Sequence, residues 1–271
     1  MPTARSNGIE LNYRFDGSED GIPIVLSNSL FSRLEMWDPQ IGALTEAGYR
    51  VLRYDARGHG RSEVTQGPYS IEMLADDLAC LLDAVGWESA HVCGLSMGGM
   101  VGQMMGTRHP ERVRSLILCD TSAYMGAEEV WEPRVQTGLA EGVEGLVESS
   151  VTRWFTPESM HRIPEEVEKV RAMIRSTPLA GFIGCCRAFQ GFDHREANRS
   201  ITAPTLVIVG DRDPGTPPSH ARVIQEAIPG AELEIIAGAA HLTNIEAPER
   251  FNALVVGFLE GVSRAYTDPR R

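Results

Sequence analysis

The stretch Cys93-Gly94-Leu95-Ser96-Met97-Gly98-Gly99 decides the fold of this chain. It follows a short apolar run at residues 90–93 and precedes a helix-compatible stretch at residues 99–108. The G-x-S-x-G pattern alone is a weak signal, but a strand–turn–helix setting is typical of a nucleophile elbow. Such a turn is strained and needs small residues, because larger ones would bring neighbouring backbone into collision. Ser96 is therefore a candidate nucleophile.

Strand-like apolar runs alternate with helix-like segments along the chain, which predicts parallel βαβ architecture. After a hairpin over residues 8–15, the expected strands are residues 23–27, 49–54, 90–93, 115–119, 205–209 and 233–236. Apolar residues recur with a 3.6-residue period from Ile71 to Val85, with Ser70 as N-cap, and predict a helix. A last helix is expected from Pro248 to Val262. We predict an α/β fold with a mostly parallel central sheet flanked by helices.

One connection is too long for an ordinary crossover. Residues 121–204 place 84 residues between two expected strands, whereas a whole βαβ unit takes about 30 residues. This segment is rich in helix formers and aromatic residues, so we expect a helical cap over the carboxyl edge of the sheet. Open α/β sheets bind their ligands at that edge. The predicted division is residues 1–122 and 200–271 for the core, with residues 123–199 as the inserted cap.

The composition excludes several classes of function. Of 271 residues, 42% are hydrophobic, and 37 acidic against 25 basic side chains give a formal net charge of −12. This balance argues against nucleic acid or an anionic membrane as partner. We find no signal peptide and no apolar run near the roughly 18 residues of a transmembrane helix.

The cysteines and histidines give no sign of a metal site. Five cysteines without a C-x-x-C pair favour a reduced, cytoplasmic protein, and the seven histidines are scattered. We therefore expect no metal and no cofactor. The sequence does not indicate an oligomeric state.

A serine hydroxyl becomes a nucleophile only when a base accepts its proton. His241 follows the last expected strand and is our candidate base. An acid must orient this histidine, and the chain order Ser, Asp, His places it between residues 96 and 241. We choose Asp213, which follows the neighbouring strand, and keep Asp120, which ends the strand before the cap, as the alternative. Asp211 is expected to face solvent or to pair with an arginine.

A tetrahedral oxyanion needs two backbone N–H donors. We expect one from Met97, which follows the candidate nucleophile. The other should come from the loop Ser27-Asn28-Ser29-Leu30-Phe31, where we choose Leu30 because Asn28-Ser29 stands where such loops usually carry His-Gly. His59 lies in an Arg-Gly-His-Gly loop, for which we expect a structural role.

With these residues in place, the chain resembles the α/β-hydrolase superfamily and, within it, the 3-oxoadipate enol-lactonases. The resemblance covers nearly the whole chain, and the Ser-Asn-Ser-Leu loop and the cap segments are its more specific parts. The matching segments are residues 26–30, 52–60, 93–99, 153–156, 185–188, 213–218 and 240–246. The chain departs from the family pattern at Phe31, Phe182 and Thr243, where Gly, Tyr and Ser are common. We expect Phe31 to narrow or reshape the substrate pocket.

The resemblance implies a serine hydrolase that opens a small carboxylated enol-lactone, turning 3-oxoadipate enol-lactone into 3-oxoadipate. A cation would hold the lactone carboxylate. Arg134 is our candidate and Arg153 the second, while Trp131 and Trp154 are expected to form apolar walls.

Other functions remain open at this point. A broad carboxylesterase or a cofactor-free perhydrolase would use the same triad and take a small-molecule ester instead. A ligand sensor on a hydrolase scaffold can also retain the triad. Epoxide hydrolases and haloalkane dehalogenases are disfavoured, because they need Asp where Ser96 stands.

Overall fold

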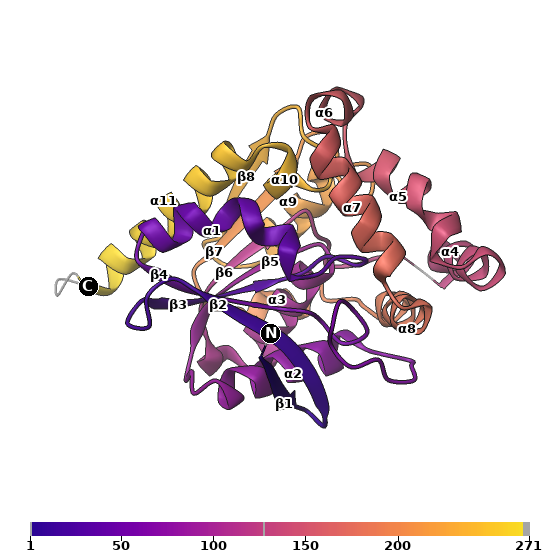
Figure 1. The fold of residues 1–271 in the computed structure, drawn as a ribbon. Coiled ribbons are helices and arrows are strands. Elements are labelled where there is room, and N and C mark those ends of the chain that lie inside the picture. Colours follow the sequence, from indigo (N-terminus) through magenta and orange to yellow (C-terminus); the bar gives the residue numbers. More distant parts are fainter. Residues whose placement is uncertain (1, 127, 268–271) are drawn as a thin grey trace.

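A computed structural model of the protein describes residues 2–126 and 128–267. Its centre is an eight-stranded sheet in the order β1-β2-β4-β3-β5-β6-β7-β8 (Figure 1). The first two strands pair antiparallel, and the strands from β3 to β8 pair parallel with one another. The strands are β1 Thr3–Ser6, β2 Ile9–Asp16, β3 Ile22–Ser27, β4 Tyr49–Tyr54, β5 Ala90–Leu95, β6 Val113–Cys119, β7 Thr205–Gly210 and β8 Glu232–Ile236.

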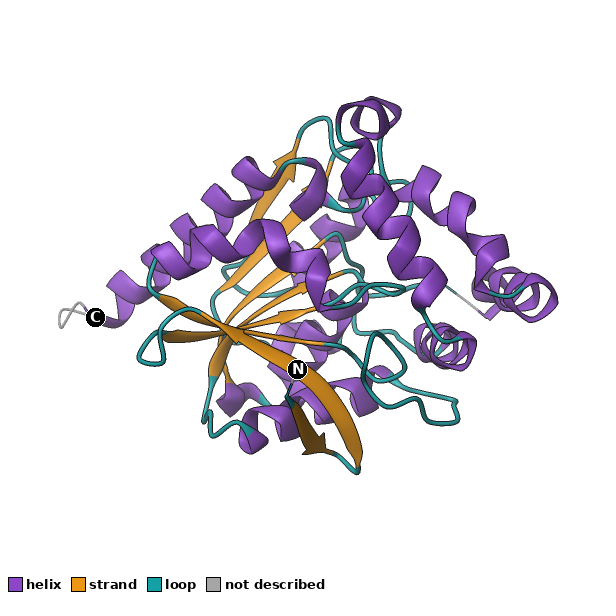
Figure 2. Cartoon of the chain, in the orientation of Figure 1, coloured by secondary structure: helices purple, strands orange, loops and turns teal. Residues whose placement is uncertain are grey.

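Helices cover both faces of this sheet. The helices α1 and α11 pack together on one face, and α2 and α3 pack together on the other (Figures 1 and 2). Every residue of β5 and β7 is buried, as expected for parallel strands covered on both sides. The helices outside the predicted cap are η1 Leu34–Trp37, α1 Asp38–Glu46, α2 Ile71–Ala84, α3 Met97–Arg108, η2 Pro110–Arg112, α9 Pro218–Ala227, α10 Thr243–Glu246 and α11 Pro248–Thr267.

The observed bounds of two helices can be compared with those predicted from the sequence pattern. Helix α2 begins after Ser70, whose hydroxyl accepts the N–H of Met73 at 3.1 Å, as its N-cap prediction required. Helix α11 continues to Thr267, five residues beyond the predicted end at Val262. The helix continues past the predicted end because residues 263–267 contain no glycine or proline to terminate it.

A second group of helices stands beyond one end of the sheet (Figure 1). These are α4 Glu128–Glu141, η3 Val143–Leu146, α5 Val147–Trp154, α6 Pro157–Arg162, α7 Pro164–Ser176 and α8 Leu179–Gln190. All of them fall within residues 123–199, and η4 Ala197–Ser200 crosses the end of that range. The exact division into core and cap stays a prediction. Among the helices of the described residues, none has the length and apolar character needed to cross a membrane.

Candidate active site

Ser96 lies in the tight turn between β5 and α3. Its φ of 57° falls in the left-handed region, which costs about 1–3 kcal/mol for a residue with a side chain. Two hydrogen bonds hold the turn in place. The Ser96 N–H donates to the Cys119 carbonyl at 2.8 Å, and the Thr121 hydroxyl donates to the Ser96 carbonyl at 2.7 Å. The surrounding structure therefore fixes a strained backbone that presents the serine side chain.

The glycines of the elbow are required by close backbone approach. A Cβ on Gly94 would lie 2.0 Å from the carbonyl oxygen of Gly98, and a Cβ on Gly98 would lie 2.0 Å from that of Ser27. No side chain fits at either position without moving backbone. This is the physical reason for the G-x-S-x-G pattern from which the elbow was predicted.

Asp213 and His241 form a buried hydrogen-bonded pair. His241 Nδ1 lies 2.7 Å from Asp213 Oδ2. The other carboxylate oxygen accepts the N–H groups of Gly215 at 2.8 Å and Thr216 at 3.0 Å. The Thr216 hydroxyl also donates to Oδ2 at 2.6 Å. Because Nδ1 faces the carboxylate, Nε2 of His241 is the nitrogen left to accept a proton.

Asp213 and His241 shift each other's pKa in opposite directions. Burial raises the pKa of Asp213, but the charge of His241 and the hydrogen bonds from His241 and Thr216 outweigh it and lower the pKa to about 2. Burial lowers the pKa of His241, yet the Asp213 carboxylate outweighs burial and raises it above its usual value. Asp213 is therefore ionised at neutral pH and stabilises a protonated His241.

The other two aspartates are placed differently. The Asp120 carboxylate accepts the N–H of Gly210 at 2.9 Å and the hydroxyl of Thr243. Burial and the nearby charge of Asp213 raise the pKa of Asp120 well above its usual value. Asp211 is exposed and accepts the N–H of Gly238 at 2.8 Å. Only Asp213 of the three carries a hydrogen bond to His241 among the described residues.

Ser96 and His241 line one cavity of about 110 Å³. The expected wall residues Trp131 and Trp154 and both candidate arginines line it as well. Its lining is Leu30, Ser96, Met100, Met125, Val130, Trp131, Arg134, Arg153, Trp154, Phe189, Gly215, Thr216 and His241. The volume lies below the about 300–1,000 Å³ of drug-sized sites, so the cavity suits a small ligand. No hydrogen bond joins the Ser96 hydroxyl to His241 among the described residues, and such contacts often tighten only when substrate binds.

Arg134 is the side chain of this cavity with the most unusual environment. Its Nη2 donates to the Ser150 hydroxyl at 2.9 Å. Its Nε is buried and has no hydrogen-bond partner within the described residues. No carboxylate of the described residues pairs with the guanidinium. Burial, and less strongly the charge of Arg153, lowers the pKa of Arg134. A half-buried guanidinium without a counter-ion, next to a second cation, favours an anionic ligand.

The two expected oxyanion donors lie next to the serine. Leu30 lines the same cavity, and Met97 is the first residue of α3, where a helix leaves its N–H groups without intrahelical acceptors. Among the described residues, neither N–H donates to a protein acceptor. Both groups are thus available to a ligand oxygen near Ser96.

Phe31, which follows Leu30, does not line the cavity in the described part of the chain. Its φ of 63° turns the fully buried side chain toward the cap, where it stacks on Phe182 with ring centroids 4.5 Å apart and planes at 7°. The Trp154 ring also lies near Phe31, with ring centroids 6.3 Å apart. The Phe31 side chain is therefore not part of the cavity lining in the described residues, and the expectation that it reshapes the pocket stays a prediction. Two of the departures from the family pattern, Phe31 and Phe182, instead pack against each other.

Sequence reasoning missed the residues that join the histidine loop to the cap. The buried Glu246 carboxylate accepts the N–H of Thr156 at 2.8 Å and that of Ala240 at 2.5 Å. The Trp154 carbonyl accepts the N–H groups of His241 and Leu242, both at 3.2 Å. No local pattern indicates contacts between segments so far apart in the chain. Thr216 was missed too, although a threonine three residues after an aspartate is a recognisable turn signal.

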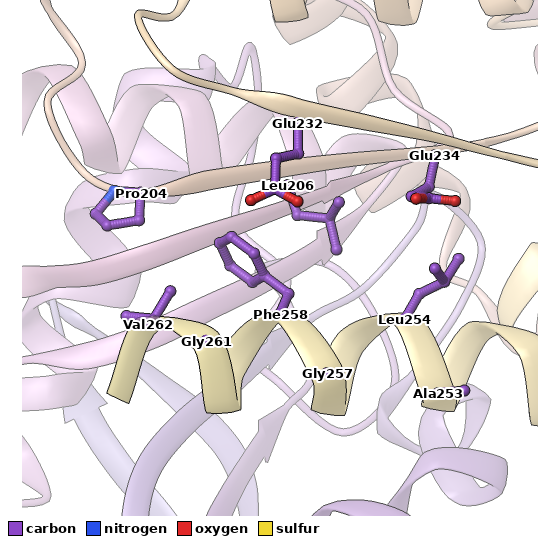
Figure 3. A pocket seen from close by; sticks show the side chains of 10 residues that line it. All are labelled: Pro204, Leu206, Glu232, Glu234, Ala253, Leu254, Gly257, Phe258, Gly261 and Val262. Carbon is purple, nitrogen blue, oxygen red and sulfur yellow. The ribbon is translucent and has the colours of Figure 1, made fainter. Parts of the chain in front are cut away.

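A larger hollow of about 590 Å³ lies between strands β7 and β8 and helix α11 (Figure 3). It is lined by Glu232 and Glu234 from β8 and by apolar and small residues, and it contains neither Ser96 nor His241. The smaller cavity is therefore the candidate active site. Within residues 2–126 and 128–267, no group of three His, Cys, Asp or Glu side chains is arranged to hold a metal ion.

The geometry agrees with comparisons to known proteins. The sequence matches the family described as the alpha/beta hydrolase fold over residues 22–248. The chain belongs to this family. The predicted fold class is thereby confirmed, and so is the prediction that the chain is a hydrolase.

Named relatives of this α/β hydrolase include lactonases. 3-Oxoadipate enol-lactonase 2 of Acinetobacter baylyi is 36% identical over 93% of this chain and 94% of its own length. A putative carbamate hydrolase, RutD, of Azorhizobium caulinodans is 33% identical over 95% of this chain and 98% of its own. The crystal structure of the enol-lactonase from Burkholderia xenovorans LB400 has a TM-score of 0.93 and 42% identity, covering 96% of this chain and 100% of that one. The resemblance to enol-lactonases predicted from the sequence is confirmed.

Proposed function

We propose that this protein is a serine hydrolase that opens a small carboxylated enol-lactone, and that 3-oxoadipate enol-lactone is its substrate. The observation that carries the proposal is the cavity that joins Ser96 and the Asp213–His241 pair to Arg134, whose guanidinium pairs with no carboxylate in the described part of the chain. The relatives named enol-lactonase support the choice of substrate. A cytoplasmic location, expected from the cysteines, stays a prediction.

The reaction begins when Ser96 Oγ attacks the lactone carbonyl and His241 Nε2 accepts the hydroxyl proton. The N–H groups of Leu30 and Met97 stabilise the tetrahedral oxyanion. The ring C–O bond then breaks, and the departing enol oxygen takes the proton from His241, after which the enol becomes a ketone. Water, deprotonated by His241, hydrolyses the acyl-Ser96 and releases the second carboxylate.

Arg134 is the residue that would make the site specific for a carboxylated lactone. The guanidinium would hold the carboxylate that the lactone already carries, with Trp131 and Trp154 as apolar walls around the ring. Arg153 lines the same cavity and remains the second candidate. A carboxylesterase or perhydrolase of broad substrate range would not need a desolvated cation in its pocket. Arg134 therefore favours the lactonase over these two alternatives.

The test of the reaction is steady-state hydrolysis of 3-oxoadipate enol-lactone and of 4-nitrophenyl acetate by the wild type and Ser96→Ala. We expect kcat/KM for the lactone near ~10⁵ M⁻¹s⁻¹ or above, far exceeding that for the acetate, and loss of both in the variant. Turnover of the acetate alone would indicate a general esterase. Tight binding without any turnover would indicate a ligand sensor.

The test of the carboxylate site compares a carboxylated with an uncharged enol-lactone in Arg134→Gln. The loss of a charged hydrogen-bond partner should lower kcat/KM about 10- to 100-fold for the carboxylated lactone only. Arg175→Gln is the matched control, because Arg175 pairs with Glu144 and does not line the cavity. An equal loss on both lactones would remove Arg134 from this role.

A further inference from the structure

The loop that carries Leu30 is a tight turn whose sequence does not favour its own conformation. The Ser32 N–H donates to the Ser29 carbonyl at 3.2 Å, so residues 29–32 form a β-turn. The Leu30 N–H belongs to the same trans peptide as the Ser29 carbonyl and points the opposite way. Phe31, at the third position, has a φ of 63°, which turns of this kind normally give to glycine. Something outside the turn must hold it.

His59 accepts a hydrogen bond from the turn. Its ring is fully buried, and Nε2 lies 3.1 Å from the Phe31 nitrogen as an acceptor. Nδ1 lies 3.2 Å from the Arg57 carbonyl, which can only accept, so Nδ1 carries the proton. Burial lowers the pKa of His59 to about 4, and the ring stays neutral at physiological pH. The Phe31 N–H thus has a permanent acceptor.

Helix α8 packs against the turn through Phe182. Phe182 stacks on Phe31 in near-parallel geometry, and both rings are fully buried. The helix cannot shift easily, because Gly181 packs backbone to backbone on Gly58 in the His59 loop: a Cβ on Gly181 would lie 2.0 Å from the Gly58 carbonyl oxygen. The histidine and the phenylalanine are therefore parts of one assembly that encloses Phe31.

We infer that Phe182 and His59 are positioning residues for the oxyanion site: together they keep Phe31 in its left-handed conformation and so direct the Leu30 N–H toward Ser96. The inference rests on the proposed function. Helix α8 then belongs to the catalytic scaffold as well as to the substrate pocket. Disturbing it should weaken stabilisation of the transition state more than binding of the ground state.

A double-mutant cycle tests this coupling with 4-nitrophenyl acetate, a substrate without a carboxylate for Arg134. Phe182→Ala should lower kcat about 10-fold, part of the 10²–10³ that loss of an oxyanion donor costs, with little change in KM. Phe31→Gly removes the stack but leaves a residue that adopts a positive φ without support, so its own kcat is the reference for the second arm of the cycle. In the Phe31→Gly background, Phe182→Ala should then cost less than about 3-fold.

A second readout separates positioning from general loss of structure. Methylboronic acid forms a tetrahedral adduct on a serine nucleophile, and its affinity should fall with kcat in Phe182→Ala. His59→Leu should behave in the same way, and His59→Gln, which keeps an acceptor for the Phe31 N–H, should recover part of the loss. If Phe182→Ala does not fold, Phe182→Leu keeps the buried volume and removes the stacking.

Phe192→Ala is the matched control. Phe192 is also buried and stacks on His194 at 5.3 Å, but it contacts neither the turn nor the cavity in any described interaction. It should lower the melting temperature and leave kcat unchanged. Equal costs of Phe182→Ala in both backgrounds, or a change in KM alone, would overturn the inference. Acetate hydrolysis that survives Ser96→Ala would overturn the proposed function and this inference with it.

Discussion

The two sides of the Ser96 pocket are held by different balances of hydrogen bonding and aromatic packing. On the histidine side, hydrogen bonds predominate: Asp213 accepts three of them from its own loop, and Glu246 and the Trp154 carbonyl join the histidine loop to residues 154–156. The Trp154 ring also stacks on His241, with ring centroids 6.1 Å apart. On the oxyanion side, the hydrogen bonds from Phe31 to His59 and from Ser32 to Ser29 are supplemented by the aromatic stack of Phe31 on Phe182. This difference suits the roles that we propose for the two sides, proton transfer on the histidine side and oxyanion stabilisation on the other.

A histidine that gains and loses a proton needs fixed charges and donors around it, because its two states differ by a full charge. An oxyanion donor needs only a fixed direction, which packing can supply. Polar changes on the histidine side should therefore alter pH dependence and rate together. Packing changes on the oxyanion side should alter the rate alone.

The largest expected effect comes from Asp213→Asn. The amide cannot stabilise a protonated His241 and favours the wrong tautomer, so kcat should fall about 10⁴-fold while the fold is retained. Steady-state kinetics beside a thermal melt would show this. If Asp120→Asn cost as much and Asp213→Asn little, Asp120 would be the acid of the triad.

Gly181→Ala should have the next largest effect and acts on the oxyanion side. The new methyl group would meet the Gly58 carbonyl, so helix α8 must move. We expect a loss of about 1–3 kcal/mol in the free energy of unfolding and about a 10-fold fall in kcat. Gly191→Ala, where a Cβ would meet nothing within 4 Å, is the control. Equal kcat values in the two variants would contradict the role of α8.

Glu246→Gln weakens the junction between the histidine loop and the cap. The amide keeps one acceptor oxygen, but its NH₂ group faces an N–H donor, so a buried donor loses its partner. The free energy of unfolding should fall by about 2 kcal/mol and kcat/KM by less than 10-fold. Urea unfolding would measure the first change. Unchanged stability would show that Glu246 does not join the two segments.

The smallest change is a shift in a pH profile. The pKa of His241 is raised above its usual 6.5, so kcat/KM should fall as the pH drops through that raised value, where the base becomes protonated. In Asp213→Asn the raising charge is absent while burial still lowers the pKa, so this acidic limb should move to lower pH. Phe182→Ala should leave the limb in place. A limb that moves with Phe182→Ala would contradict the division between the two sides.

The same division explains what the sequence could predict. The elbow turn and the Asp213–His241 pair could be predicted from local patterns and chain order, because each candidate catalytic group follows a strand that ends at the same edge of the sheet. The stack of Phe31 on Phe182 and the bond from Phe31 to His59 join distant segments and leave no periodicity to detect. Phe31 departs visibly from the family pattern, but its left-handed φ, which turns it away from the pocket, depends on those tertiary contacts.

Labelling with a fluorophosphonate, followed by peptide mass spectrometry, tests the central claim most directly. The account predicts one label per chain, on Ser96, with lactone hydrolysis lost in proportion to labelling. It also predicts that 3-oxoadipate slows labelling of the wild type and has little effect on Arg134→Gln. Label on another residue, or lactone turnover that persists in fully labelled protein, would contradict a Ser96-dependent lactonase.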